Sequence, residues 1–148
     1  MAETQDLIDL YSKRILALAA DIPHSTPLAE PQAHVMKRSP LCGSTVTADV
    51  VVEDGRLADL GMDVKACALG QASASLLGSV AIGMTRDEIA GGREALAAML
   101  KKGAPPPDQP PFDELKVLEP ARDYRNRHAS IMLAWDAVLA AMDEAAAS

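Results

Sequence analysis

Aromatic side chains and positive charge are both scarce in this sequence of 148 residues. Trp, Tyr and Phe make up only 3% of the chain, so aliphatic residues and alanine must build most of the hydrophobic core. Lys and Arg number 14 against 21 Asp and Glu, which gives a net charge of −7. This charge argues against non-specific binding to nucleic acid or to anionic membrane surfaces, because both need basic patches on the protein.

Long hydrophobic runs are also missing, and residues 1–6 contain no basic segment leading into an apolar stretch. We therefore expect neither a signal peptide nor a membrane span. Cysteine occurs only twice, as Cys42 and Cys67. Without an export signal, we expect a cytoplasmic, reducing environment in which the two thiols serve as metal ligands or nucleophiles. A disulfide between them is the less favoured alternative.

The remaining composition is that of a globular protein, with 49% hydrophobic and 24% charged residues. A chain of this length is sufficient for one hydrophobic core. There is no internal repeat and no composition change that would mark a boundary. We therefore expect a single domain over residues 1–148.

Helical patterns cover most of the chain outside residues 45–64. Apolar positions repeat at helical spacing over residues 6–20, and three prolines in 22–33 indicate an extended surface loop. The run of small and apolar residues 72–82 predicts a buried helix. Thr85 and Glu88 form a capping-box pattern that begins another helix, which should continue to about Lys102 with Gly91-Gly92 weakening it. After a proline-rich stretch, 103–111, a short helix is expected over 112–118 and a final helix over 127–145.

Residues 45–53 and 56–64 alternate between apolar and polar side chains, which predicts a β-hairpin. A two-residue Asp54-Gly55 turn would pair Val50 with Asp59 and would put carboxylates on the apolar face. A three-residue loop 53–55 would pair Val50 with Ala58 and keep that face apolar, so it is the preferred register. With helices before and after the strands, the predicted fold class is α+β, a small antiparallel sheet packed against several helices.

The preferred register brings the two cysteines together, because it sets Cys42 beside Ala66 at one end of the sheet. Cys67 should lie just before a helix, where free N–H groups and the helix dipole favour a thiolate. Thiolates are needed for metal binding and for persulfide transfer. Two isolated cysteines would be interpreted as small buried hydrophobic residues, but convergence of the pair favours a functional site.

Histidine could supply a third ligand, since two thiols and an imidazole are a known zinc donor set. His128, at the start of the final helix, is the main candidate. His24 is interpreted as a surface residue, and His34 has only a small chance of reaching the site. Ser44 and Ser130 are interpreted as caps or hydrogen-bonding groups, because a neutral hydroxyl is a poor metal ligand.

Several segments of the sequence together resemble the iron–sulfur cluster scaffold family of IscU, SufU and the NifU N-terminal domain. The most specific segment is Cys67 to Ser75, which resembles the second cysteine and the helix start of the family. Four weaker segments follow the family order: Leu10-Tyr11, Pro40-Leu41-Cys42-Gly43, Val52-Glu53-Asp54-Gly55-Arg56 and Leu133-Ala134-Trp135. The insertion after Ala98-Met99-Leu100-Lys101 is closer to the SufU branch.

The resemblance implies a site of three cysteines and an aspartate that holds zinc or a [2Fe–2S] cluster and receives sulfur from a cysteine desulfurase. Cys42 and Cys67 match two of the cysteines. Ser44 stands at the aspartate position and Ser130 at the third cysteine position. His128 could substitute if the backbone there is still loop, and Ser44, Ser130 and Arg127 would then lie around the metal ligands. The chaperone-binding run of IscU is absent, and residues 124–127 stand in its place.

Three functions are compatible with these residues. The favoured one is a non-enzymatic iron–sulfur assembly scaffold or carrier, which would hold its cluster with Cys42, Cys67 and His128 and pass it to recipient apo proteins. The second is a zinc-dependent sulfurtransferase that works with a desulfurase. The third is a metal-free adaptor that keeps only the fold.

Overall fold

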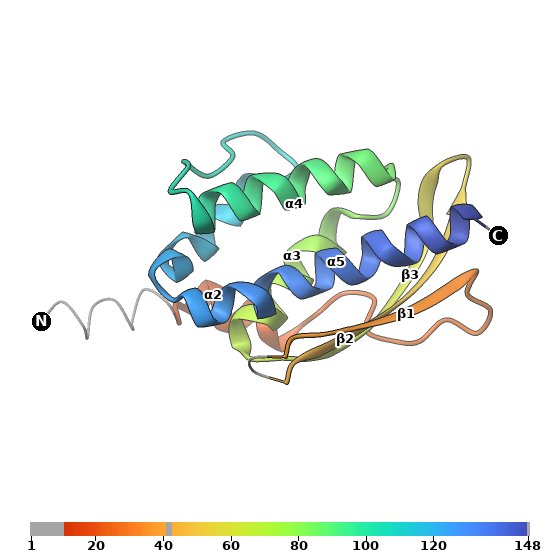
Figure 1. Ribbon diagram of the computed structural model, residues 1–148, viewed down its shortest axis with the longest axis horizontal. Helices are drawn as coiled ribbons and strands as arrows, with labels where there is room; N and C mark the ends of the chain where they lie inside the picture. Colours follow the sequence, from red (N-terminus) through yellow and green to blue (C-terminus); the bar gives the residue numbers. More distant parts are fainter. Residues whose placement is uncertain (1–10, 41–42, 148) are drawn as a thin grey trace, which may run out of the picture.

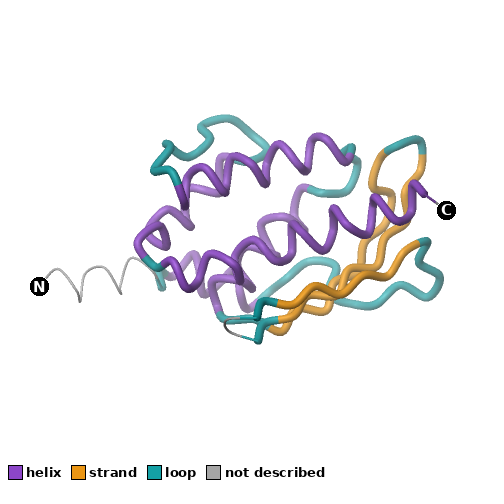
Figure 2. Tube along the Cα trace, viewed as in Figure 1, coloured by secondary structure: helices purple, strands orange, loops and turns teal. Residues whose placement is uncertain are grey.

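The computed structural model of the protein describes residues 11–40 and 43–147 as an α+β fold (Figures 1 and 2). The three strands are β1 (Ala33–Arg38), β2 (Thr45–Glu53) and β3 (Arg56–Lys65). The helices are α2 (Lys13–Ala20), α3 (Ala68–Val80), α4 (Arg86–Lys101), the 3₁₀ segment η1 (Asp113–Asp123) and α5 (Arg125–Ala147). The described helices and strands thus have the predicted fold class.

The sheet is antiparallel, in the order β1-β2-β3. The first strand, β1, was not predicted, because its residues follow a proline-rich segment and its side chains are mostly exposed. An edge strand with one solvated face carries a weak hydrophobic pattern, so its pairing with β2 decides its structure.

The β2–β3 hairpin differs from both registers considered from the sequence. Glu53 pairs with Arg56 across a two-residue turn, in which Asp54 and Gly55 have φ of 54° and 76°. Positive φ at both turn positions matches the twist of a hairpin and suits an Asp-Gly pair. The preferred three-residue loop was therefore wrong.

A register shift restores the apolar face that the sequence pattern required. Between Val51 and Val52 the pairing moves by one residue, and Ala58 is left without a partner. The result pairs Val50 with Leu60 and Val46 with Val64. One bulged residue changes which side chains share a face, so a two-residue turn plus a bulge keeps carboxylates off the core.

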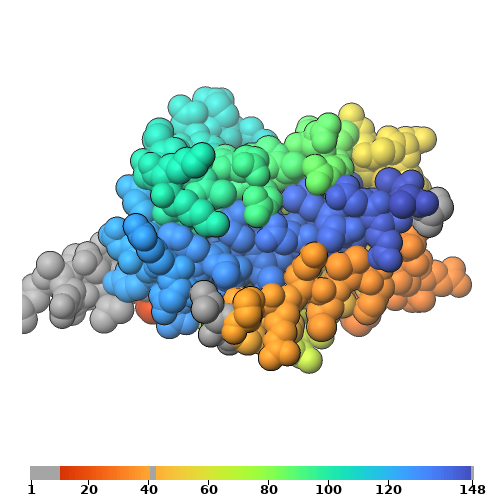
Figure 3. Space-filling model, viewed as in Figure 1, coloured from red at the N-terminus to blue at the C-terminus, as the bar shows by residue number. Residues whose placement is uncertain are grey.

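Helix α5 lies at the centre of the molecule. It packs against β1, β2, α3 and α4, and Figure 3 shows it between α4 and the strands. Its Trp135 is fully buried and donates a hydrogen bond from Nε1 to the Ser73 hydroxyl on α3, over 3.0 Å. The Ser73 hydroxyl in turn donates to the carbonyl of Ile131, so polar atoms in this core are paired.

Helix α4 begins at the predicted capping box. The Thr85 hydroxyl accepts from the Glu88 N–H, and the Glu88 carboxylate accepts from the Thr85 N–H, which lowers the pKa of Glu88. Gly91 and Gly92 do not interrupt the helix. A Cβ on Gly92 would lie 2.5 Å from the Phe112 ring, so this glycine allows the segment after the proline-rich stretch to pack against α4.

The other predicted helix boundaries were close to the observed ones. Helix α2 ends at Ala20 as expected, and α3 begins four residues before the predicted start. The predicted helix over 112–118 is the longer 3₁₀ segment η1, and α5 extends the last predicted helix at both ends. Among the described helices, none combines the length and the apolar character needed to span a bilayer.

Candidate functional site

Cys67 is the N-cap residue of α3, with extended backbone angles of −66° and 169°. The predicted position of this thiol, immediately before a helix, is therefore confirmed. It is partly exposed, and its Sγ lies 3.5 Å from the Ser130 hydroxyl oxygen on α5. The thiol is thus held at the junction of two helices with one face open to solvent.

Ser44 completes this cluster from the sheet side. Its hydroxyl lies 3.2 Å from that of Ser130, and the two side chains are 5% and 1% exposed. Ser44 directly precedes β2, Cys67 follows β3, and Ser130 comes from the second turn of α5. Three segments far apart in sequence therefore bring one thiol and two hydroxyls together at one end of the sheet.

A small residue on α3 makes this close approach possible. A Cβ on Gly70 would lie 2.6 Å from the Ser130 hydroxyl and 3.0 Å from its carbonyl oxygen. Any larger residue there would push α5 away from the start of α3. The Cys67–Ser130 contact therefore depends on glycine one turn into α3.

Cys42 lies outside the described residues, so its predicted place beside Cys67 remains a prediction. The residues on either side of 41–42 are joined by backbone hydrogen bonds. Ser39 donates its N–H to the Ser44 carbonyl over 2.8 Å, and Gly43, with φ of 71°, donates to the Ser39 carbonyl. These bonds close the β1–β2 connection at the sheet end where Ser44 meets Ser130.

The side chain of His128 is buried and points away from Cys67. Its Nε2 lies 3.0 Å from the carbonyl oxygen of Ala121 and 3.1 Å from that of Arg122, so this nitrogen carries the proton and donates. Helix α5 already begins at Arg125, and residues two apart in a helix point to nearly opposite sides. With Ser130 facing Cys67, the His128 side chain faces η1 instead.

Metal ligation by His128 therefore requires a change in the first turn of α5 and remains a prediction. Among the described residues, no group of three or more His, Cys, Asp and Glu side chains is arranged to hold a metal ion. Arg127, which the sequence placed around the ligands, is in the same first turn and donates its N–H to the Tyr124 carbonyl. Its role also remains a prediction.

A second polar pair, on the outer face of the sheet, was not found from the sequence. The Asp49 carboxylate, 5% exposed, is bonded to Nδ1 of His34 and accepts the N–H of Leu28 over 3.1 Å. His34 pairs with Asp49 across β1 and β2. Asp49 thus anchors the proline-containing loop to the sheet through Leu28. The His34–Asp49 pair could have been predicted only from the β1–β2 register.

This architecture, an antiparallel sheet covered by helices, is found in solved structures. The N-terminal part of a nitrogen-fixing NifU-like protein from Brucella abortus is 43% identical to this chain, covering 97% of it and 99% of that structure, with a TM-score of 0.92. No protein-family model matches the chain. The comparison with curated proteins gave no match either.

Two more distant structures share the fold. One is a putative iron–sulfur cluster assembly scaffold protein for the SUF system from Fervidobacterium islandicum AW-1, at 18% identity, with 91% and 98% of the two chains covered and a TM-score of 0.79. The other is a hypothetical protein at 21% identity, with 92% and 98% covered and a TM-score of 0.81. At 43% identity over nearly its whole length, the chain belongs to the family of NifU N-terminal-like, IscU and SufU proteins.

Proposed function

We propose that this protein is a scaffold or carrier in iron–sulfur cluster assembly, acting in a reducing cytosol. Iron and sulfide would be its cargo, a cysteine desulfurase its sulfur donor, and apo iron–sulfur proteins its recipients. The observation that carries this proposal is the meeting of Cys67, Ser44 and Ser130, which the resemblance assigns to three of the four family ligand positions. Membership of the family supports the same role.

The available donor atoms determine what kind of scaffold this would be. Cys67 and Cys42 can ligate as thiolates, whereas Ser44 and Ser130 offer neutral hydroxyls that bind metals weakly. Two protein thiolates leave positions on a [2Fe–2S] cluster for outside ligands. We therefore expect cargo that is held loosely and transferred readily. His128 would be a third protein ligand only after a change in the first turn of α5 that frees it from the carbonyls of Ala121 and Arg122.

The test is the content of iron, zinc and acid-labile sulfide per chain, on protein purified without oxygen and without chelators. Wild type is compared with Cys67→Ser, Cys42→Ser and the control Ser79→Ala, whose hydroxyl bonds within α3 far along the helix from Cys67. We expect iron and sulfide in wild type and control, and a loss of both in each cysteine variant. Unchanged metal content in Cys67→Ser would refute the site.

One observation favours an alternative function. The Ser44 and Ser130 hydroxyls contact each other, so two ligand positions already satisfy part of their own hydrogen bonding without a metal. A metal-free adaptor would use the fold alone, and it would bind a desulfurase equally well after Cys42→Ser and Cys67→Ser. Such a result, with no metal in wild type, would replace the scaffold proposal with the adaptor.

The zinc-dependent sulfurtransferase is distinguished by its product. One cysteine would accept a sulfur atom, and Cys67, at the start of α3 and partly exposed, is a candidate for this role. Zinc at about one per chain, together with a persulfide on Cys67 during desulfurase turnover, would favour this function. Mass spectrometry of the intact chain would detect the added sulfur.

A further inference from the structure

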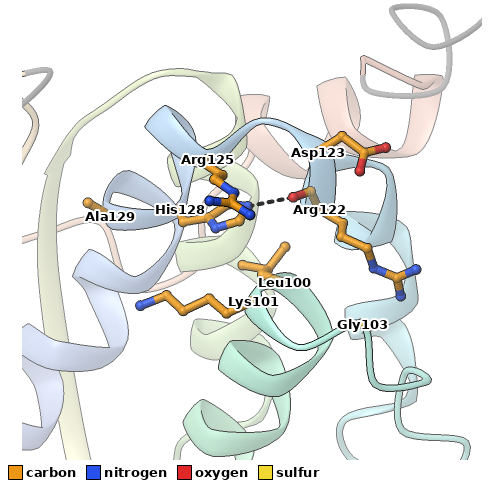
Figure 4. Close-up of a pocket in the computed structure, with 8 residues that line it drawn as sticks. All are labelled: Leu100, Lys101, Gly103, Arg122, Asp123, Arg125, His128 and Ala129. Atoms are coloured by element: carbon orange, nitrogen blue, oxygen red, sulfur yellow. Dashed lines mark hydrogen bonds between the residues drawn. The ribbon is translucent and has the colours of Figure 1, made fainter.

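A cavity of about 640 Å³ lies beside the first turn of α5, and Figure 4 shows the residues that line it. It is formed where α4 ends, η1 ends and α5 begins. Its charged and polar lining comes from Lys101, Arg122, Asp123, Arg125 and His128. A volume of this size lies within the range of small-molecule sites.

The cationic side chains in this cavity differ in their hydrogen-bond and ion-pair partners. Arg122 is committed to the structure, since its guanidinium donates to the carbonyls of Met99 and Ala104 and pairs with Glu119. Lys101 and Arg125 are exposed and have no ion-pair partner among the described residues. Two cations therefore line the cavity without forming an ion pair to any described residue, although the Asp123 carboxylate also lines it.

The other charges around the cavity strengthen this imbalance. Figure 4 shows the Asp123 carboxylate pointing away from the Lys101 and Arg125 side chains. The carbonyls at the end of α4 would attract cations, but Arg122 already binds one of them, at Met99. The first turn of α5 adds partial positive charge from its N–H groups. Basic side chains thus outnumber the single carboxylate in the lining of this cavity, in a chain whose net charge is −7.

We propose that this cavity binds a small oxyanion, a phosphate or a carboxylate group, between Lys101 and Arg125. The Arg125 guanidinium can offer two parallel N–H donors to such a group, and Lys101 adds a compact charge. The site is separate from the cluster of Cys67, Ser44 and Ser130. In this structure His128 lines the cavity and bonds to η1, whereas Ser130, two residues further along α5, contacts Cys67. Anion binding here needs no metal and does not depend on the proposed function.

The test is a calorimetric titration of the full chain with pyrophosphate and, separately, with citrate, at constant ionic strength. These two probes distinguish a phosphate from a carboxylate ligand. Lys101→Gln/Arg125→Gln removes both free cations, and Lys37→Gln/Lys116→Gln removes two positive charges from exposed positions outside the cavity. Circular dichroism establishes that both variants are folded.

We expect saturable binding of at least one probe to wild type, weakened about tenfold or more in Lys101→Gln/Arg125→Gln and within about twofold in the control. Amide NMR shifts of the wild type on titration should be largest at Gly103 and Ala129, which line the cavity. No saturable binding of either probe would overturn the proposal. Equal weakening in both double variants, or shifts centred elsewhere, would overturn it as well.

Discussion

The hydroxyl of Ser130 contacts Cys67 and Ser44. The donor atoms of these side chains determine how strongly the cluster can bind a metal. The Ser130 hydroxyl lies 3.5 Å from the Cys67 sulfur and 3.2 Å from the Ser44 hydroxyl. Exchanging a hydroxyl for a thiol or a carboxylate at these positions changes the charge and softness of the donor with little change in the backbone. The cluster can therefore be tested by adding donors as well as by removing them.

We predict that Ser44→Asp/Ser130→Cys binds zinc at least tenfold more tightly than wild type. The variant would supply two thiolates and a carboxylate at positions 44, 67 and 130, in place of one thiolate and two neutral hydroxyls. Competition with a chromophoric chelator under reducing conditions measures the affinity. Equal affinity of the variant and wild type would show that these three side chains do not share a metal.

His128 has a structural task that is separate from any ligand role. Its Nε2 is the donor for the carbonyls of Ala121 and Arg122, and the imidazole is 6% exposed. We predict that His128→Ala lowers the free energy of unfolding by about 1–3 kcal/mol, because buried acceptors lose their donor. Urea unfolding followed by circular dichroism measures this change.

The metal content of the same variant tests the ligand role of His128. If His128 ligates the cargo, metal per folded chain falls in His128→Ala and stays at the wild-type level in Ser130→Ala. Unchanged metal per folded chain in His128→Ala would assign His128 to the structural task alone. The opposite pattern, with loss only in Ser130→Ala, would mean that the third ligand position was aligned incorrectly.

At the scale of elements, the approach of α3 to α5 determines whether the cluster can form. Gly70 is the contact point, since an added Cβ would meet Ser130 atoms at 2.6 and 3.0 Å and the Ala66 Cβ at 2.8 Å. We predict that Gly70→Ala lowers the free energy of unfolding by about 1–3 kcal/mol, in spite of the better helix propensity of alanine. Chemical denaturation is the measurement.

The matched control for this prediction is Gly91→Ala on α4, where an added Cβ meets no atom within 4 Å. There, only propensity acts, and we expect stabilisation of about 0.5–1 kcal/mol. If both substitutions stabilise the protein by similar amounts, α3 and α5 have room to separate, and the close contact at Ser130 is not required for folding.

The hairpin shows how much of an element could be predicted from the sequence. Alternation over residues 45–64 was enough to predict two strands with one apolar face, because side chains alternate on any strand. The exact pairing was not predicted, since a bulge at Ala58 is compatible with the same alternation. The edge strand β1 was missed for a related reason, because most of its side chains are exposed and its pairing with β2 is a long-range property.

The candidate site could be predicted in outline and not in detail. A cysteine immediately before a small-residue helix, as at Cys67, is a local pattern, and it was identified correctly. The contact of Ser44 with Ser130 joins residues 86 positions apart, and the direction of His128 depends on where α5 begins. Neither is determined by local sequence, so the structure was needed to show that Ser130 and His128 face different sides of α5.

At the scale of the whole molecule, Cys67 packs against the hydrophobic core, but the fully buried members of that core are other apolar side chains. Trp135, the only tryptophan, is fully buried on the central helix, and its ring centroid lies 5.8 Å from that of Phe112. Ion pairs join α4 to α5, including Arg93 with Asp136 at 2.6 Å, a hydrogen bond that raises the pKa of Arg93. Apolar burial and helix packing of this kind stabilise a fold without a metal.

We therefore predict that the chelator-treated, metal-free protein stays folded and unfolds cooperatively, with coincident transitions in Trp135 fluorescence and far-UV circular dichroism. Small zinc domains behave differently, because metal binding supplies most of their folding free energy. Metal added at 100 times its dissociation constant should raise the stability of wild type by about 2.7 kcal/mol, through mass action alone. Cys67→Ser should have the same metal-free stability within about 1 kcal/mol and should not respond to metal. Loss of the cooperative transition on chelation would contradict the separation of core and cluster, because it would make the metal part of the fold rather than cargo.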